Sequence, residues 1–208
     1  MRSTTVHALV LAAGAARRFG SPKGLADYRG RPLIRHVVES VSTAIATRGP
    51  ASAVTVVLGP EPEPLREALS GTGVDIAINE HLSDGLSSSL RLGIQSLPPG
   101  TSAVLIVLAD QALVASDEYQ RLLDVARTNP ERPIAAAYDD TVGVPAVFPA
   151  RYFERLSALQ GDRGAGSLLK SDDQVVPIDM PSAAFDIDTP EQLAAALKDP
   201  ETPVALMV

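Results

Sequence analysis

The sequence contains no cysteine. Disulfide bonds, thiolate nucleophiles and zinc sites built on thiolates are therefore excluded. An excess of basic residues is also missing, because 25 aspartates and glutamates outnumber 18 lysines and arginines and give a formal net charge of −7. No cluster of cations is larger than the pair Arg17 and Arg18. Partners such as nucleic acid or an acidic membrane surface call for a basic face, so we expect neither.

Long hydrophobic runs are absent as well. The aliphatic run at residues 103–109 is far shorter than the roughly 20 residues that a membrane-spanning helix needs. Residues 1–7 contain no apolar signal-peptide region, so we expect a cytoplasmic protein. The 208 residues, 45% of them hydrophobic, suffice for one domain with a sizeable core. We expect that domain to cover residues 1–198 and residues 199–208 to form a tail, because prolines in the tail discourage further helix.

The most informative stretch is the loop at residues 11–23, which combines glycines with cations. It follows the apolar segment Val6–Leu11, which predicts a buried strand. Open α/β sheets bind ligands at the carboxyl ends of their strands, where backbone N–H groups point outward. Glycines such as Gly14 let the backbone approach a ligand, and Arg18 and Lys23 can donate charge-assisted hydrogen bonds to phosphate oxygens. The pattern predicts a polyphosphate-binding loop.

This loop matches neither of the common nucleotide fingerprints. A Walker A loop requires Gly-Lys-Ser/Thr after its second glycine, whereas Gly20 is followed by Ser21-Pro22-Lys23. The glycine spacing of the dinucleotide fingerprint is also absent after Leu11. The residues of the loop alone leave an alternative open, namely an ordinary strand-to-helix connection with exposed cations.

The loop and several later motifs resemble the MobA-like nucleotidyltransferases. The signature of that family is Leu-Ala-Ala/Gly-Gly, a short spacer, Arg-Met-Gly and then a lysine; here Leu11-Ala12-Ala13-Gly14 begins it and Phe19 replaces the methionine. The other matching segments, in chain order, are Gly30-Arg31-Pro32-Leu33-Ile34, Asn79, Gly85-Leu86-Ser87-Ser88-Ser89-Leu90, Leu108-Ala109-Asp110-Gln111, Gly161-Asp162-Arg163-Gly164-Ala165 and Asp186-Ile187-Asp188-Thr189-Pro190. They span nearly the whole chain. The closest pattern is similar to the molybdenum cofactor cytidylyltransferases, which join CMP from CTP to the phosphate of molybdopterin.

Hydrophobic periodicity predicts alternating strands and helices. We expect strands at residues 6–11, 53–58, 74–78, 103–108, 134–138 and 146–148, and helices at residues 33–45, 64–69, 86–97, 116–128, from 151 and 190–198. Residues 103–108 form the most apolar of these segments, which predicts the central strand of the sheet. This α/β alternation predicts a three-layer α/β/α sandwich with a largely parallel sheet. The resemblance implies the Rossmann-like mixed sheet of the nucleotide-diphospho-sugar transferases. Prolines and glycines at residues 143–149 predict a less regular, acceptor-side region.

Three aspartates are the predicted ligands of Mg²⁺, which prefers one or two carboxylates together with phosphate oxygens and water. Asp110 follows the apolar strand at residues 103–108, where an unpaired carboxylate is costly. Asp186 and Asp188 are spaced to face one side of an extended segment at the end of the last strand, and analogy with related enzymes favours Asp186. Two structural alternatives stay open. Asp188 could be the N-cap of the helix that starts at Pro190, and Asp110 could cap the next turn.

The resemblance implies the remaining site residues. Lys23 is expected near the α-phosphate, where a cation stabilises charge that develops during transfer, and Arg18 is expected to contact phosphate oxygens. The proposed nucleotide-binding set is Leu11, Ala12, Ala13, Gly14, Arg18, Lys23, Asn79, Gly85, Ser88 and Ser89, and the proposed catalytic set is Lys23, Arg18 and Asp110. Asn79, Ser88 and Ser89 offer compact donors and acceptors for a pyrimidine edge, unless the serines merely face solvent in a first helical turn. The methyl group of Ala13 leaves less room for a purine, which favours CTP or UTP over GTP.

The implied reaction is an Mg²⁺-dependent transfer of CMP from CTP to a molybdopterin-type phosphate, with release of pyrophosphate. Three departures from the family pattern weaken the assignment of the acceptor, because Ala112, Gly166 and Ala16 stand where proline, arginine and serine are usual. A cytidylyl- or uridylyltransferase for a sugar phosphate or another small phosphate is one alternative. The other is a non-catalytic nucleotide-binding accessory protein that serves a molybdoenzyme client.

Overall fold

The computed structural model of the protein describes residues 5–14, 19, 22–49 and 52–198. The predicted phosphate contact Arg18 and the predicted tail at residues 199–208 lie outside this range.

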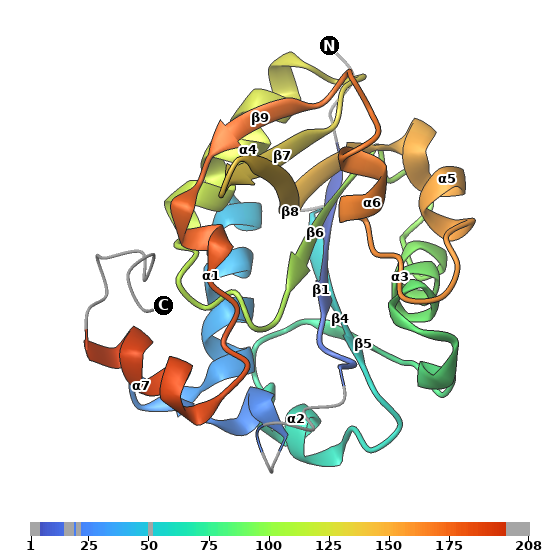
Figure 1. The fold of residues 1–208 in the computed structure, drawn as a ribbon. Coiled ribbons are helices and arrows are strands. Elements are labelled where there is room, and N and C mark those ends of the chain that lie inside the picture. The colour runs from blue at the N-terminus through green and yellow to red at the C-terminus, as the bar shows by residue number, and fades with distance from the viewer. Residues whose placement is uncertain (1–4, 15–18, 20–21, 50–51, 199–208) are drawn as a thin grey trace.

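A seven-stranded sheet forms the middle layer of the molecule (Figure 1), with the strand order β5-β4-β1-β6-β8-β7-β9. The strands are β1 (Val6–Leu11), β4 (Ala53–Leu58), β5 (Asp75–Ile78), β6 (Ala103–Leu108), β7 (Ile134–Tyr138), β8 (Thr141–Pro149) and β9 (Val176–Asp179). Strand β8 pairs antiparallel with β6 and β7, while the other pairs in this sheet are parallel. The sheet is thus mixed and largely parallel, and β6 is its middle strand, as the sequence predicted. A separate two-stranded hairpin joins β2 (Asp27–Tyr28) to β3 (Arg31–Pro32).

Helices cover both faces of the sheet and complete the three-layer sandwich (Figure 1). They are α1 (Leu33–Ala46), α2 (Glu63–Ala68), α3 (Leu86–Gln95), α4 (Ser116–Thr128), α5 (Phe153–Ser157), α6 (Gly166–Leu169) and α7 (Pro190–Lys198). One core cluster packs α1 and α4 against alternate residues of β1 and β6, and a second packs α3, α5 and α6 against the opposite face. Helix α1 buries its apolar side chains at helical spacing, and each aliphatic side chain so buried contributes about 1.5–3 kcal/mol of transfer free energy.

The last third of the chain differs in detail from the prediction. Strand β8 begins at Thr141 rather than near residue 146, because Asp139 and Asp140 both adopt positive φ and close a two-residue hairpin between β7 and β8. The helix expected from residue 151 begins at Phe153, after a 3₁₀ turn. The expectation that the last strand ends at Asp186 is wrong. Strand β9 ends at Asp179, and the 3₁₀ turn Pro181–Ala184 separates it from the aspartates.

In the described part of the chain, no helix combines the length and the apolar character that crossing a bilayer would require.

Candidate active site

Three carboxylates and one ammonium group from distant parts of the chain meet at the carboxyl ends of β1 and β6. The Nζ atom of Lys23 donates to Asp110 Oδ2 at 2.7 Å and to Asp188 Oδ1 at 2.8 Å. The side chains of Lys23 and Asp110 are 19% and 22% exposed, whereas that of Asp188 is 46% exposed. The structure therefore brings together Lys23, Asp110, Asp186 and Asp188, although they lie up to 165 residues apart.

The central strands position Lys23 and Asp110. Strands β1 and β6 pair in parallel along their whole length, and the Ala109 N–H donates to the carbonyl of Leu11 at 3.1 Å, so both chains leave the sheet at the same edge. Lys23 then begins the 3₁₀ turn Lys23–Leu25. Asp110 follows β6 almost directly. It does not cap the next turn, because its Oδ2 atom accepts from Lys23 and its Oδ1 atom is buried without a partner among the described residues.

A backbone contact places the two later aspartates beside Asp110. The Ile187 N–H donates to the Asp110 carbonyl at 3.1 Å, and the Ile187 side chain is fully buried in the core. Asp186 and Asp188 flank this anchored residue. Both interact electrostatically with Lys23. The two aspartates thus come to the site on a segment anchored at Ile187 and not on a β-strand, and that both face one side stays a prediction.

Helix α7 is capped by Thr189 and Gln192 and not by Asp188. Gln192 Oε1 accepts from the backbone N–H of Thr189 at 3.0 Å, and the Gln192 N–H donates to Thr189 Oγ1 at 3.2 Å, which is a capping box. Gln192 Oε1 also accepts from the Asp188 N–H at 2.7 Å. The backbone of Asp188 is thereby fixed while its carboxylate remains available to Lys23.

The described residues of this cluster carry more negative than positive charge. Burial, followed by the charges of Asp110 and Asp188, raises the pKa of Asp186 to about 6, and the charge of Lys23 offsets only part of this rise. For Lys23 itself, burial opposes the charged form, but Asp110 and Asp188 outweigh it and the pKa is raised. Among the described residues, one lysine thus faces three carboxylates, an arrangement suited to a further cation.

Two carboxylate oxygens fit a divalent ion. Asp110 Oδ1 and Asp186 Oδ1 are buried and have no hydrogen-bond partner among the described residues, although buried polar atoms are normally satisfied. Mg²⁺ commonly takes one or two carboxylates and completes its shell with water and phosphate oxygens. The described residues contain no group of three or more histidine, aspartate or glutamate side chains arranged to hold a metal by themselves. This donor set therefore suits an ion shared with a phosphorylated ligand.

Gln111 is a positioning residue that sequence reasoning noted only as part of a motif. Its side chain is 2% exposed, and its Nε2 atom donates to the carbonyls of Val144 at 3.0 Å and Ala183 at 2.9 Å. One amide thus ties the end of β6 to β8 and to the 3₁₀ turn that precedes Asp186. Its position next to Asp110 is the feature of the sequence that could have pointed to a role for Gln111. Its hydrogen-bond partners, however, depend on the tertiary structure.

Asn79, Ser88 and Ser89 form a second, buried group. Asn79 Nδ2 donates to Ser88 Oγ at 2.8 Å and to Ser89 Oγ at 2.9 Å, and Ser88 Oγ donates to the Gly85 carbonyl at 2.8 Å. Asn79 Oδ1 accepts from the His81 N–H at 2.9 Å. The alternative that the serines face solvent is wrong, because Ser88 is 6% and Ser89 is 2% exposed. Their polar atoms brace the start of α3, and direct contact of any of the three with a base stays a prediction.

Gly85 is where the Gly-Asp-Arg-Gly-Ala motif packs onto α3. Gly85 has φ +82°, and a β-carbon there would lie 2.5 Å from the Gly161 carbonyl oxygen and 2.7 Å from Asp162 Oδ1. The Ser87 N–H donates to the same Gly161 carbonyl at 3.1 Å. Only glycine permits this contact between two predicted motifs.

The described part of the first loop lies close to this second group. Leu11 and Ala13 are buried, and the Ala12 N–H donates to the Val57 carbonyl at 2.9 Å. A β-carbon on Gly59 would lie 3.6 Å from the Ala13 carbonyl and 3.1 Å from the Leu82 side chain, so Gly59 separates the loop from the turn before α3. Gly14 is exposed, with no atom near its missing β-carbon. Nucleotide contacts in this stretch would therefore come mainly from the backbone.

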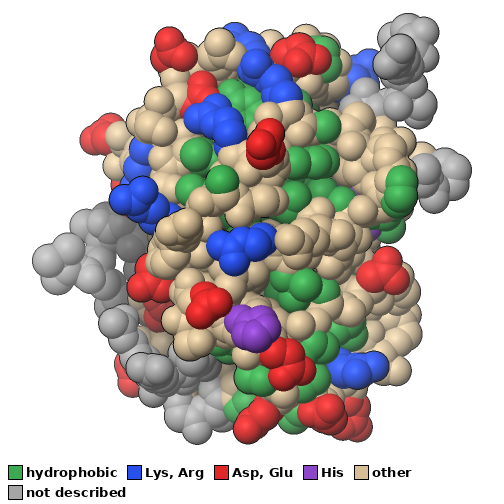
Figure 2. Space-filling view, turned by 90° about the vertical axis from the view of Figure 1, so that its right-hand side faces the viewer, with side chains coloured by type: hydrophobic (Ala, Val, Ile, Leu, Met, Phe, Trp, Pro, Cys, Tyr) green, Lys and Arg blue, Asp and Glu red, His purple; other side chains and the backbone are tan. Residues whose placement is uncertain are grey.

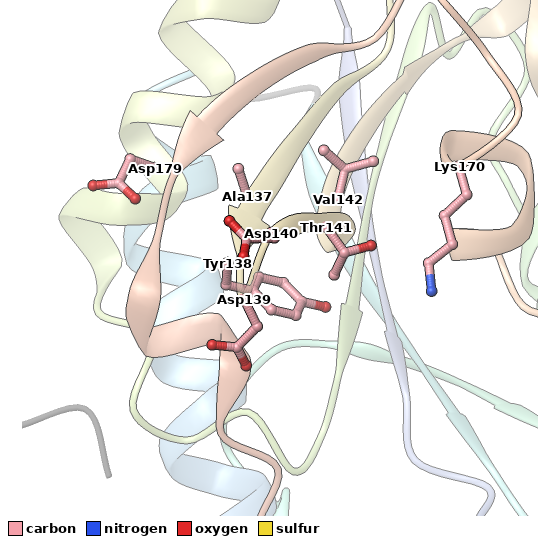
Figure 3. A pocket seen from close by; sticks show the side chains of 8 residues that line it. All are labelled: Ala137, Tyr138, Asp139, Asp140, Thr141, Val142, Lys170 and Asp179. Atoms are coloured by element: carbon pink, nitrogen blue, oxygen red, sulfur yellow. The ribbon is translucent and has the colours of Figure 1, made fainter. Parts of the chain in front are cut away.

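An open pocket of about 760 Å³ lies at the β7–β8 hairpin (Figure 3). Its lining residues are Ala137, Tyr138, Asp139, Asp140, Thr141, Val142, Lys170 and Asp179. Figure 3 shows Lys170 across the pocket from the hairpin. Burial, followed by the charges of Asp186 and Asp139, raises the pKa of Tyr138, so this tyrosine lies within electrostatic reach of both the carboxylate cluster and the hairpin.

The face covered by α3, α5 and α6 carries acidic and basic side chains intermingled with hydrophobic ones (Figure 2). No field of one sign dominates this face, and the candidate site lies at the strand ends instead.

The family model described as "MobA-like NTP transferase domain" matches residues 8–175. The chain belongs to this family. The match contains the first loop, Asp110 and the Gly-Asp-Arg-Gly-Ala motif. It ends before the segment with Asp186 and Asp188, whose link to the site rests on the contacts above.

Relatives of this MobA-like chain carry different names. It is 30% identical over 141 residues to the bifunctional protein GlmU of Burkholderia orbicola, covering 66% of the chain but only 29% of that protein. It is also 30% identical over 200 residues to nicotine blue oxidoreductase of Paenarthrobacter nicotinovorans, covering 90% of the chain and 94% of that protein. The crystal structure of Rv0371c from Mycobacterium tuberculosis has a TM-score of 0.79 and 27% identity, covering 94% of this chain and all of that one. A second structure of Rv0371c, with a TM-score of 0.74 and 26% identity, is a complex with manganese.

Proposed function

We propose that the protein is a divalent-metal-dependent nucleotidyltransferase that transfers CMP from CTP to a small phosphate acceptor, with a molybdopterin-type phosphate as the first candidate. The observation that carries the proposal is the convergence of Lys23, Asp110 and Asp186 at the strand ends of a MobA-like domain. Two buried carboxylate oxygens without a partner among the described residues lie there beside Lys23, whose ammonium group could donate to a phosphate.

In the proposed reaction, an oxygen of the acceptor phosphate attacks the α-phosphorus of the nucleotide, and the bond to the leaving pyrophosphate breaks. No enzyme nucleophile is needed, so catalysis consists of positioning and electrostatic stabilisation. Lys23 would stabilise negative charge on the transferring phosphoryl group. Asp110 and Asp186 would hold Mg²⁺, which when bound neutralises phosphate charge. Arg18 is proposed to add a second cation.

The choice of nucleotide is proposed from the second group of residues. The loop at Ala13 and the turn at Leu82, which precedes the start of α3 that Asn79, Ser88 and Ser89 brace, lie on either side of Gly59. Glycine at position 13 would leave more room for a purine than alanine does, although the Ala13 side chain is itself buried. This supports CTP or UTP as the substrate rather than GTP.

The pocket at the β7–β8 hairpin is the proposed acceptor site, because its lining residue Tyr138 lies within electrostatic reach of Asp186. Its lining includes three aspartates and one lysine, Lys170. A phosphate would meet Lys170, while hydroxyl or amino groups of the acceptor would suit Asp139 and Asp140. A sugar phosphate therefore remains a specific competitor of molybdopterin.

Pyrophosphate release tests the proposal directly. The protein is incubated with CTP, UTP, GTP or ATP, with Mg²⁺ or Mn²⁺, and with molybdopterin or a set of sugar 1-phosphates. We expect the most pyrophosphate with CTP and molybdopterin, and none after chelation of the metal. If nucleotide binds but no pair yields pyrophosphate, the accessory-protein alternative replaces the enzyme.

Near-full-length similarity to nicotine blue oxidoreductase favours a second candidate, an oxidoreductase activity. The same preparation can be mixed with nicotine blue and NADH or NADPH. Protein-dependent loss of colour without pyrophosphate release in the first assay would establish this candidate and reject nucleotidyl transfer.

Two substitutions test the assigned roles. Asp110→Asn and Lys23→Ala are each expected to lower turnover at least about 100-fold, because electrostatic stabilisers of developing charge contribute on that scale. Lys198→Ala, which removes an exposed lysine outside both the carboxylate cluster and the pocket, serves as the control. Circular dichroism and urea denaturation verify that the fold survives. Near-normal turnover of either site variant would contradict its role.

A further inference from the structure

Asp110 uses its two carboxylate oxygens differently. Oδ2 accepts from Lys23 at 2.7 Å, while Oδ1 is buried and has no partner among the described residues. The aspartate thus stands between two positive positions, one filled by the lysine ammonium and one suited to a metal ion. Of the two neighbouring carboxylates, Asp188 bonds the lysine and Asp186 does not.

Asp186 and Asp188 face different surroundings. Asp186 Oδ1 is buried and unpartnered among the described residues, like Asp110 Oδ1. Asp188 is about half exposed, and its Oδ1 atom accepts from Lys23 at 2.8 Å. Ile187 separates them, held by its buried side chain and by its N–H bond to the Asp110 carbonyl. The capping box fixes the Asp188 backbone independently of the carboxylate.

We propose that Asp188 is not a metal ligand but a positioning residue that holds the Lys23 ammonium against Asp110. The inference rests on the proposed function and deepens it, because it separates the residues that would hold the ion, Asp110 and Asp186, from the pair that orients the lysine. With two anchors, the long and flexible lysine side chain is confined to one location. Without Asp188, Asp110 is the one anchor of Lys23 among the described residues, and part of that orientation is lost.

Metal affinity distinguishes a ligand from a positioning residue. Binding of Mn²⁺ alone is measured by electron paramagnetic resonance of the free ion for the wild type, Asp186→Asn, Asp188→Asn and Glu191→Gln. Glu191 is a matched control because it is an exposed acid in the first turn of α7. Asp186→Asn is expected to weaken Mn²⁺ binding at least about tenfold, whereas Asp188→Asn and Glu191→Gln stay within about twofold of the wild type. Weakening of Mn²⁺ binding by Asp188→Asn to the same extent as by Asp186→Asn overturns the proposal.

The chemical reactivity of Lys23 is the second measurement. It would not change if Asp188 only stabilised the fold. Brief acetylation with acetic anhydride, followed by peptide mass spectrometry, compares the labelling of Lys23 with that of Lys170. Loss of the hydrogen bond to Asp188 frees the ammonium, so Asp188→Asn should raise relative labelling of Lys23 by about threefold or more. Glu191→Gln should leave it unchanged. Unchanged labelling in Asp188→Asn overturns the proposal.

Turnover supplies the third measurement where a productive substrate pair exists. Asp188→Asn should lower kcat more than it raises KM for the nucleotide, Asp188→Glu should restore part of kcat, and the effect should nearly vanish in a Lys23→Met background. Full additivity with Lys23→Met overturns the proposal. The metal and labelling experiments need no turnover, so absence of nucleotidyl transfer would remove the proposed function without deciding the role of Asp188.

Discussion

Asp186 is the residue whose surroundings oppose its ionised form most clearly within the candidate active site. Its pKa is raised to about 6 from an ordinary 3.8, and burial is the main cause. Lys23 bonds directly to Asp110 and Asp188 but not to Asp186. A side chain that is costly to ionise in the protein alone is the one that gains most when a cation is bound.

Asp186 should therefore make stability depend on pH in the absence of divalent ions. The folded-state pKa of about 6 exceeds the ordinary value of 3.8, so the folded protein binds more protons than the unfolded chain between them. Stability then falls as pH rises from about 4 to about 6 and remains low above that range. Asp186→Asn should remove this contribution and raise the free energy of unfolding at pH 7 by on the order of 2 kcal/mol. Urea denaturation with a chelator across this pH range measures it, with Asp179→Asn as control; an unchanged slope in Asp186→Asn would contradict the assignment.

Among the elements, the start of α3 depends on contacts from outside the helix. It has no side-chain N-cap of its own, and its first residue follows Gly85 in an extended, left-handed conformation with φ +82° and ψ −175°. Asn79 and the carbonyl of Gly161 satisfy polar groups of its first turn. The helix end is therefore tied to both β5 and the loop at residues 161–164.

Substitution of Gly85 should break this junction. Gly85→Ala forces a side chain into a backbone region that glycine almost alone adopts and against Gly161 and Asp162, so we expect a loss of about 3 kcal/mol in stability. Gly161→Ala is a matched control, because it has positive φ but open space around the missing β-carbon, and should cost only about 1 kcal/mol. The free energies come from urea denaturation. Equal losses in the two variants would show that the contact between the motifs contributes nothing.

For the whole molecule, the candidate site unites three parts of the chain. Lys23 comes from the loop after β1, Asp110 from the end of β6, and Asp186 with Asp188 from the connection to α7. The antiparallel strand β8 and the Gln111 side chain hold the last of these parts beside the first two. A ligand that binds across the site would link the two ends of the fold.

Nucleotide and metal together should therefore stabilise the whole protein. At free CTP near 100 times its Kd with Mg²⁺ present, binding should add about 2.7 kcal/mol to the free energy of unfolding, which corresponds to several degrees in Tm for a protein of this size. Differential scanning fluorimetry should show a larger rise with both ligands than the sum of the rises with each one. Lys170→Met should keep this synergy and Asp110→Asn should lose it. If the synergy persists in Asp110→Asn, the metal does not bind at Asp110 and the prediction is wrong.

The amino-acid sequence by itself determined the alternation of strands and helices, the central place of β6, and the candidate residues of the first loop and after β6. These features depend on local periodicity and on residues adjacent in the chain, which a sequence displays directly. It did not reveal that Asp188 contacts Lys23, that Thr189 and Gln192 cap α7, or that Asn79 satisfies Ser88 and Ser89. Those facts required the tertiary structure, because each depends on which of several chemically equivalent donors and acceptors the packed core brings within hydrogen-bond distance. Asp186 and Asp188 are identical side chains two residues apart. That one is buried without a partner among the described residues and the other bonds Lys23 is therefore a consequence of the fold around them.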